Sequence, residues 1–154
     1  MDKTNALRLL DAAGISYTVH EYCADEDRGE EVARLVGKPC DEVFETLVTT
    51  SDKGGYFVFV VPVNTTLNLK KAAKAAGVKA VAMLKQKELL PLTGYVHGGC
   101  SPVGMKKPFP TFVNETAILF DTVCVSAGKR GMQMELSPAD LIAYVSASYA
   151  DLTD

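Results

Sequence analysis

The sequence is poor in the residues from which many enzymes build a catalytic centre. It has two histidines among its 154 residues, so a Ser–His–Asp triad is disfavoured and a histidine-rich metal site is excluded. The patterns HExxH and GxSxG do not occur, and no GxGxxG follows a strand. We therefore expect a protein that works without a metal, a cofactor or a dedicated side-chain nucleophile.

Cysteine and long apolar runs are also scarce. The four cysteines lie far apart and form no CxxC pair, so neither a zinc site nor a disulfide framework is expected. No stretch approaches the roughly 18 consecutive apolar residues of a membrane span, so we expect no membrane partner. The first 14 residues are amphipathic and lack the apolar segment of a signal peptide. We therefore expect a cytoplasmic protein.

Length and charge suit one globular domain over residues 1–154. Hydrophobic residues make up 47% of the chain and charged residues 23%, and the net charge of −3 by itself argues against nucleic acid, including DNA, as a partner. However, residues 51–110 carry nine lysines and two acidic residues, whereas the segments on both sides are acidic. Either this basic third presents a positive face to a phosphate backbone, or its lysines only solvate a helix.

Apolar periodicity and capping residues predict alternating helices and strands early in the chain and hairpins late. Asn68 is expected to cap one helix and Ser137 another, with Pro138 at the first helical position. Helices are expected over 5–13, 30–36, 69–76 and 85–90. A last helix is expected to begin at residue 138 and to place Ser148 or Tyr149 on its inner face. Strands are expected over 15–22, 43–50, 56–63, 79–83, 111–114, 117–120, 122–126 and 132–136. The fold class is α/β (α+β), with a mixed, partly antiparallel sheet and helices packed around it.

The loop at 94–108 is too polar and too rich in glycine for a core element. Gly98 and Gly99 permit backbone conformations closed to other residues, while Pro102 restricts both itself and Ser101. Backbone N–H groups, the Ser101 hydroxyl and two following lysines suit an ester, carboxylate or phosphate. The alternative is an ordinary tight surface loop.

Glu45 is a candidate pocket residue on the strand expected over 43–50. It shares a strand face with Val43 and Leu47, so it points toward the apolar side or lines a pocket. An unpaired carboxylate is costly to bury. Phe44 and Val48 could equally mark the core face.

Two further segments offer weaker signals. On the strand expected over 15–22, Tyr22 could stack on a nucleobase, and His20 is either a base or simply solvated. The turn at 126–131, SAGKRG, is similar in composition to a phosphate-binding loop but lacks the GxxxxGK[ST] spacing, so a P-loop is rejected.

These segments together resemble a known family, the YbaK-type aminoacyl-tRNA deacylases, which are related to the editing domain of bacterial prolyl-tRNA synthetases. The matching stretches are ISYTVHEY at 15–22, VFETLVT at 43–49, VPV at 61–63 with LNLKKAAKAAG at 67–77, TGYVHGGCSPVGMKK at 93–107 and SAGKRG at 126–131. Their order and spacing make the resemblance specific and extend it over nearly the full chain.

The resemblance implies a single editing domain with a curved, partly barrel-like mixed sheet. It implies trans-editing, the removal of a wrong amino acid, typically cysteine or alanine, from the acceptor end of mischarged tRNA(Pro), with prolyl-tRNA synthetase as a second candidate partner. In cysteine-specific members the substrate's own thiol attacks the ester carbonyl, and a free cysteine thiol with a pKa near 8.5 suits this role.

The resemblance also distributes roles among the residues. It places the catalytic contacts at the position of Glu45 and at Gly98, Gly99 and Ser101. Substrate contacts are expected from Tyr22, Thr46, Pro102, Ser126, Gly128 and Lys129. We expect the phosphates of tRNA to meet Lys70, Lys71, Lys106 and Lys107.

One position departs from the family pattern. The family usually has a lysine that is important for activity where this chain has Glu45, and a glutamate there should repel the phosphates of the acceptor end. Three explanations stand: a nearby lysine such as Lys129 or Lys70 substitutes, deacylation is lost and only binding of tRNA or a synthetase remains, or the substrate differs.

Overall fold

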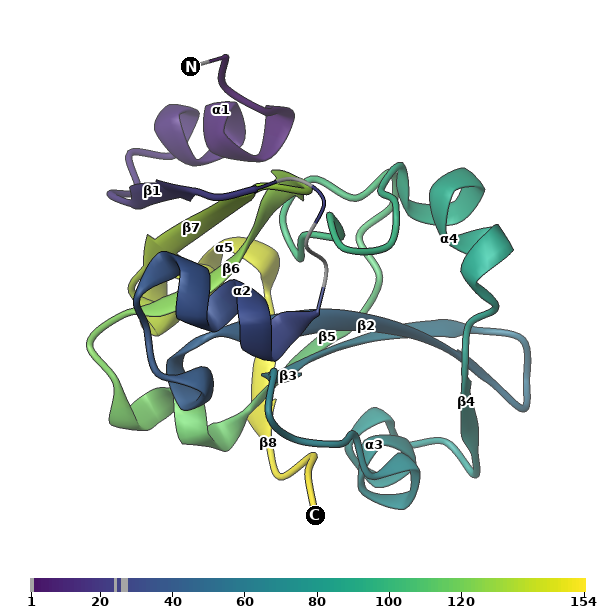
Figure 1. Ribbon diagram of the computed structural model, residues 1–154. Helices are drawn as coiled ribbons and strands as arrows, with labels where there is room; N and C mark the ends of the chain where they lie inside the picture. The colour runs from purple at the N-terminus through teal and green to yellow at the C-terminus, as the bar shows by residue number, and fades with distance from the viewer. Residues whose placement is uncertain (1, 24, 26–27) are drawn as a thin grey trace.

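The computed structural model describes residues 2–23, 25 and 28–154, and a five-stranded mixed sheet forms one half of its framework (Figure 1). In spatial order its strands are β4 (Val81–Met83), β2 (Phe44–Ser51), β3 (Tyr56–Pro62), β5 (Thr111–Asn114) and β8 (Ser148–Ala150). β2 pairs antiparallel with β3 and β4, whereas β3 with β5 and β5 with β8 are parallel. The predicted mixed sheet and single α/β architecture are confirmed.

A second, antiparallel sheet contains β1 (Thr18–Glu21), β7 (Met132–Leu136) and β6 (Val123–Lys129), with β7 in the middle. A parallel bridge between Val43 and Cys124 joins the two sheets at one corner. The sheets therefore curve around a shared core as an open arrangement and do not close into a barrel.

Within the described part of the chain, five α-helices cover the sheets, and their ends follow local sequence signals. They are α1 (Asn5–Ala12), α2 (Gly29–Val36), α3 (Leu69–Ala76), α4 (Gln86–Thr93) and α5 (Pro138–Val145), together with short 3₁₀-helices η1 (Cys40–Glu42) and η2 (Glu115–Leu119). The Asn68 side chain accepts hydrogen bonds from the N–H groups of Lys70 and Lys71, as expected of a helix cap. Among the described residues, no helix has the length and apolar character needed to cross a membrane.

The central strand β3 divides the hydrophobic core into two parts. Val58 and Val60 face the larger part, which lies between the two sheets and includes α1. Phe59 and Val61 face the smaller part, which is closed by α3 (Figure 1). All four side chains are fully buried, so the prediction of a strand buried on both faces is confirmed.

Two predicted elements differ from the structure in the C-terminal half. The expected strand over 117–120 is the 3₁₀-helix η2, in which Ala117 is buried while Ile118 and Leu119 are exposed, because a short apolar run does not distinguish a strand from a turn. The helix α5 ends at Val145, and its C-cap residue Ser146 adopts a left-handed φ of 55°. Ser148 and Tyr149 then continue as the edge strand β8.

Two further corrections concern turns. Pro91 does not end a helix but lies inside α4, where it removes one N–H donor while Gly94 N still donates to Leu90 O at 2.9 Å. The segment 126–131 is not a free loop, because β6 runs to Lys129 and contains a bulge between Ser126 and Lys129. Gly128 occupies this bulge with a φ of 108°.

Candidate functional site

A small cavity lies where the two sheets, α2 and the glycine-rich loop meet. Its walls come from the start of β2, from β6 and β7, and from the loop, and its lining includes Glu45, Thr46, Gly98, Ser126 and Gln133. The volume is about 100 Å³. Because one water needs roughly 10–15 Å³ measured in this way, the space suits a small amino-acid group and not a nucleoside.

Glu45 contributes the only acidic side chain among the described residues that line this cavity, and none of them is Lys or Arg. Phe44 and Val48 face the core, which confirms that reading of the strand, and Glu45 is half-buried beside them. Burial raises the pKa of Glu45 to about 7. No described residue forms a hydrogen bond or ion pair with its carboxyl group.

Two further polar groups in the lining have no partner. The hydroxyl oxygen of Thr46 and the amide oxygen of Gln133 are buried without a hydrogen bond from any described residue. Ser126 differs, because its hydroxyl accepts a hydrogen bond from Gly128 N at 3.1 Å and so supports the β6 bulge. Buried polar atoms normally have partners, so these two oxygens are available to accept hydrogen bonds from water or from a ligand in the cavity.

The glycine-rich loop closes one side of the cavity through backbone packing. Gly98 and Cys100 line the cavity, and Gly98 has a φ of 85°. A Cβ atom on Gly99 would come within 3.0 Å of Lys129 Cα, so this glycine permits the close approach of the loop to β6. Ser101 is fully buried, and its hydroxyl accepts from Val103 N at 3.2 Å.

The structure therefore brings together only part of the predicted site. Glu45, Thr46, Gly98 and Ser126 share the cavity. Gly99, Ser101 and Gly128 shape the loop and bulge behind it without entering its lining, and Pro102 lines a different hollow together with Lys107. Tyr22 lies just after β1, where its N–H donates to Gly131 O at 3.0 Å, and is outside the lining.

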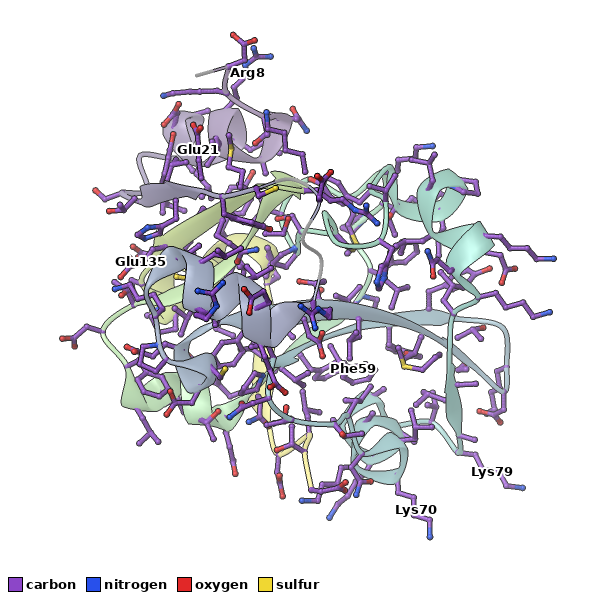
Figure 2. All side chains as sticks on the ribbon, in the orientation of Figure 1. Arg8, Glu21, Phe59, Lys70, Lys79 and Glu135 are labelled. Carbon is purple, nitrogen blue, oxygen red and sulfur yellow. The ribbon has the colours of Figure 1, made fainter. Side chains whose placement is uncertain are left out.

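The predicted phosphate-binding lysines lie apart from the cavity. Lys70 extends from α3 at the lower edge of the molecule, at the opposite end from the glycine-rich loop (Figure 2). Lys71 forms an ion pair with Asp151 at 3.0 Å, and Lys106 donates to Pro91 O at 3.3 Å. Lys129 meets the loop through its backbone.

Gln133 and His97 are polar lining residues that sequence reasoning missed. Gln133 lies between Met132 and Met134 on β7, and all three are buried. The signal that could have found Gln133 is the presence of an amide in an otherwise apolar buried strand, since such a group needs a partner.

A charged cluster surrounds Glu135 on β7, outside the cavity lining. Glu135 accepts hydrogen bonds from Thr122, His20 and Lys38 at 2.5, 2.7 and 3.0 Å. Burial opposes ionisation of Glu135, but these bonds outweigh it and hold the pKa at about 2. Ligand atoms of His20, Cys124 and Glu135 lie within 4.8 Å of one another. This trio does not favour a metal, because Lys38 already pairs with Glu135 and burial raises the pKa of Cys124 to about 12.

The raised pKa of Glu45 has a measurable effect on stability. Its ordinary value is 4.5, so the folded state binds the proton more tightly than the unfolded state does. The contribution of Glu45 to the free energy of unfolding therefore falls as the pH rises from about 4.5 through 7. We expect Glu45→Gln to lose less stability than the wild type between pH 5 and pH 8, measured by urea unfolding. An unchanged difference between the two pH values would contradict the burial of this carboxyl group.

Comparison with known proteins agrees with this fold. The sequence model of the aminoacyl-tRNA editing domain matches residues 25–144, and the chain belongs to this family. The resemblance drawn from the sequence motifs is therefore confirmed.

Individual relatives extend the match over the whole chain. The candidate Cys-tRNA(Pro)/Cys-tRNA(Cys) deacylase EbsC of Enterococcus faecalis (strain ATCC 700802 / V583) is 45% identical, over 98% of this chain and 93% of that protein. The crystal structure of a candidate trans-editing enzyme for prolyl tRNA synthetase superposes with a TM-score of 0.86 at 26% identity, covering 99% of each chain. That of hypothetical protein APE2540 has a TM-score of 0.88 at 25% identity, over 96% of this chain and 98% of the other.

Proposed function

We propose that this protein is a trans-editing deacylase that removes a wrong amino acid, cysteine first and alanine second, from mischarged tRNA(Pro) in the cytoplasm. The observation that carries the proposal is the position of the cavity. It is built from the start of β2, the glycine-rich loop and the β6 bulge, which are segments that carry the family resemblance. Its small volume suits a small aminoacyl group.

The proposed chemistry uses the substrate's own thiol. The thiol sulfur forms a bond to the ester carbonyl carbon, the bond from that carbon to the ribose oxygen breaks, and the ribose oxygen takes up the proton. An alanyl ester lacks the thiol, so water replaces it as nucleophile. The chain contributes positioning and stabilisation of the charge that develops on the carbonyl oxygen.

The loop offers specific backbone donors for that oxygen. Gly99 N already donates to Val96 O at 2.9 Å, so it is occupied. The N–H groups of Gly98 and Cys100, both in the cavity lining, form no hydrogen bond with any described residue. We assign these two groups, and not the buried Ser101 hydroxyl, to the role of oxyanion donors.

The acceptor end of tRNA is the proposed partner, and prolyl-tRNA synthetase is a second one. Lysines from the basic central third, such as Lys70 and Lys79, extend into solvent (Figure 2). They can meet tRNA phosphates away from the cavity, and the affinity for tRNA should then fall steeply with salt.

A second candidate function is binding without turnover. The observation that favours it is Glu45, which occupies the position of the family's lysine and lies in the cavity itself. In that case the protein would sequester tRNA or dock on a synthetase.

Deacylation of Cys-tRNA(Pro) and Ala-tRNA(Pro) separates the two functions. We expect the wild type to release cysteine faster than alanine, and both well above the uncatalysed rate. Glu45→Lys is measured in parallel, with Glu21→Lys on the exposed edge strand β1 as the matched control. If the wild type shows no deacylation and the Glu45→Lys variant does, Glu45 inactivates an otherwise intact editing site. The binding function would then replace the enzymatic one.

A further inference from the structure

The polar side chains that line the cavity are suited to a ligand that carries positive charge and N–H donors. They supply one carboxyl group from Glu45, and the unpartnered oxygens of Thr46 and Gln133. Gln133 is only 6% exposed, so its amide is held in place by the surrounding core. None of the described lining residues is Lys or Arg, and His97 is the one side chain of the described lining that can carry a positive charge.

These three groups come from opposite sides of the same cavity. Glu45 and Thr46 are neighbours at the start of β2, in the five-stranded sheet. Gln133 is on β7 in the other sheet, where it pairs across the strands with Ser126. The bridge between Val43 and Cys124 holds the two sheets together beside them. All three residues border one cavity, with Glu45 and Thr46 on opposite faces of β2.

An ammonium group matches this set. It has three N–H donors and no acceptor, and it carries the charge that a carboxylate prefers. A neutral hydroxyl ligand would leave the carboxylate uncompensated, and a phosphate or carboxylate ligand would be repelled by it.

We infer that the cavity recognises the free α-ammonium group of the aminoacyl ester through Glu45, Thr46 and Gln133, and thereby excludes aminoacyl-tRNAs whose amino group is acylated. The inference rests on the proposed deacylase function and adds its specificity. It also gives Glu45 a role that the lysine of the family pattern cannot have, since a lysine would repel the same ammonium group.

A pair of stable analogues tests this recognition without turnover. One is adenosine carrying L-cysteine through a 3′-amide, and the other is the same compound acetylated on the α-nitrogen. The two differ in the charge and donors of one nitrogen, and loss of a charge-assisted hydrogen bond weakens binding about tenfold or more. We expect the acetylated compound to bind the wild type at least about tenfold more weakly in calorimetry.

Variants locate the effect in the cavity. Glu45→Gln keeps the shape of the side chain and removes its charge, so the difference between the two analogues should shrink to about threefold or less, as expected when charge assistance is lost. Gln133→Leu and Thr46→Val should each weaken binding of the free-amine compound and leave the affinity for the acetylated compound unchanged. Glu21→Gln changes an exposed glutamate of β1 that is not among the lining residues; it is the control and should keep the full difference.

The outcomes separate this inference from the proposed function. Equal binding of both analogues to the wild type, or equal cleavage of Cys-tRNA and N-acetyl-Cys-tRNA, would overturn ammonium recognition while leaving the deacylase function intact. If the wild type binds neither analogue and cleaves neither tRNA, both proposals are wrong. A full difference that persists in Glu45→Gln, Gln133→Leu and Thr46→Val would place recognition elsewhere and overturn the assignment.

Discussion

Gly99→Val is expected to lower kcat/KM for Cys-tRNA(Pro) at least about a hundredfold, because displacement of a catalytic element by about 1 Å can cost that much. A Cβ atom at this position would lie 3.0 Å from Lys129 Cα, 3.1 Å from Arg130 N and 3.1 Å from Lys129 C. All three are backbone atoms, so none can rotate away. The loop must therefore move off the β6–β7 hairpin and carry Gly98 and Cys100, with their proposed oxyanion donors, out of position.

Gly55→Val is the matched control for this prediction. Gly55 lies in the exposed β2–β3 turn, and a Cβ atom there would meet its nearest neighbour, Ser51 Oγ, at an ordinary 3.6 Å. It should keep wild-type turnover. Circular dichroism establishes that both variants fold, and turnover by Gly99→Val within twofold of the wild type would show that loop position does not matter.

Phe59→Ala is expected to reduce the free energy of unfolding by about 3–5 kcal/mol, the usual cost of removing a buried aromatic ring. Phe59 is fully buried on the central strand β3, near the middle of the molecule (Figure 2). Its ring stacks on that of Phe112 with centroids 5.6 Å apart and packs in the part of the core that α3 closes. The cavity left by truncation cannot collapse easily, because β-strand backbone borders it on both sides along β3.

Urea unfolding with Leu119→Ala as control measures this loss. Leu119 is also a large apolar residue, but it is 77% exposed, so its truncation should change stability by about 0.5 kcal/mol or less. A loss below about 1 kcal/mol for Phe59→Ala would mean that the smaller part of the core contributes little, against the expectation for buried rings.

Much of the fold was predictable because its signals are local. The cap at Asn68, the cap at Ser137 with its following proline, and the buried run of β3 depend on neighbours in the chain, and each was placed correctly. The errors occurred where tertiary contacts overrode local preference. The bulge in β6 depends on its pairing with β7, and the strand β8 exists because β5 offers it an edge.

The candidate site divides in the same way. Sequence motifs identified Glu45, Thr46, Gly98 and Ser126, which line the cavity. They did not reveal that Ser101 is buried behind the loop or that Lys71 is paired with Asp151, since both facts depend on which distant segments come to lie beside them.

By itself the sequence determined the fold class, most helix and strand positions and membership of the aminoacyl-tRNA editing domain family, because periodicity, caps and motif order are properties of residues close together in the chain. Only the tertiary structure decided which polar groups share a cavity. Thr46 and Gln133 are separated by more than half of the chain and belong to different sheets, which join at the bridge between Val43 and Cys124. A pocket of unpartnered acceptors around one carboxyl group arises from that non-local contact, and no local pattern records it.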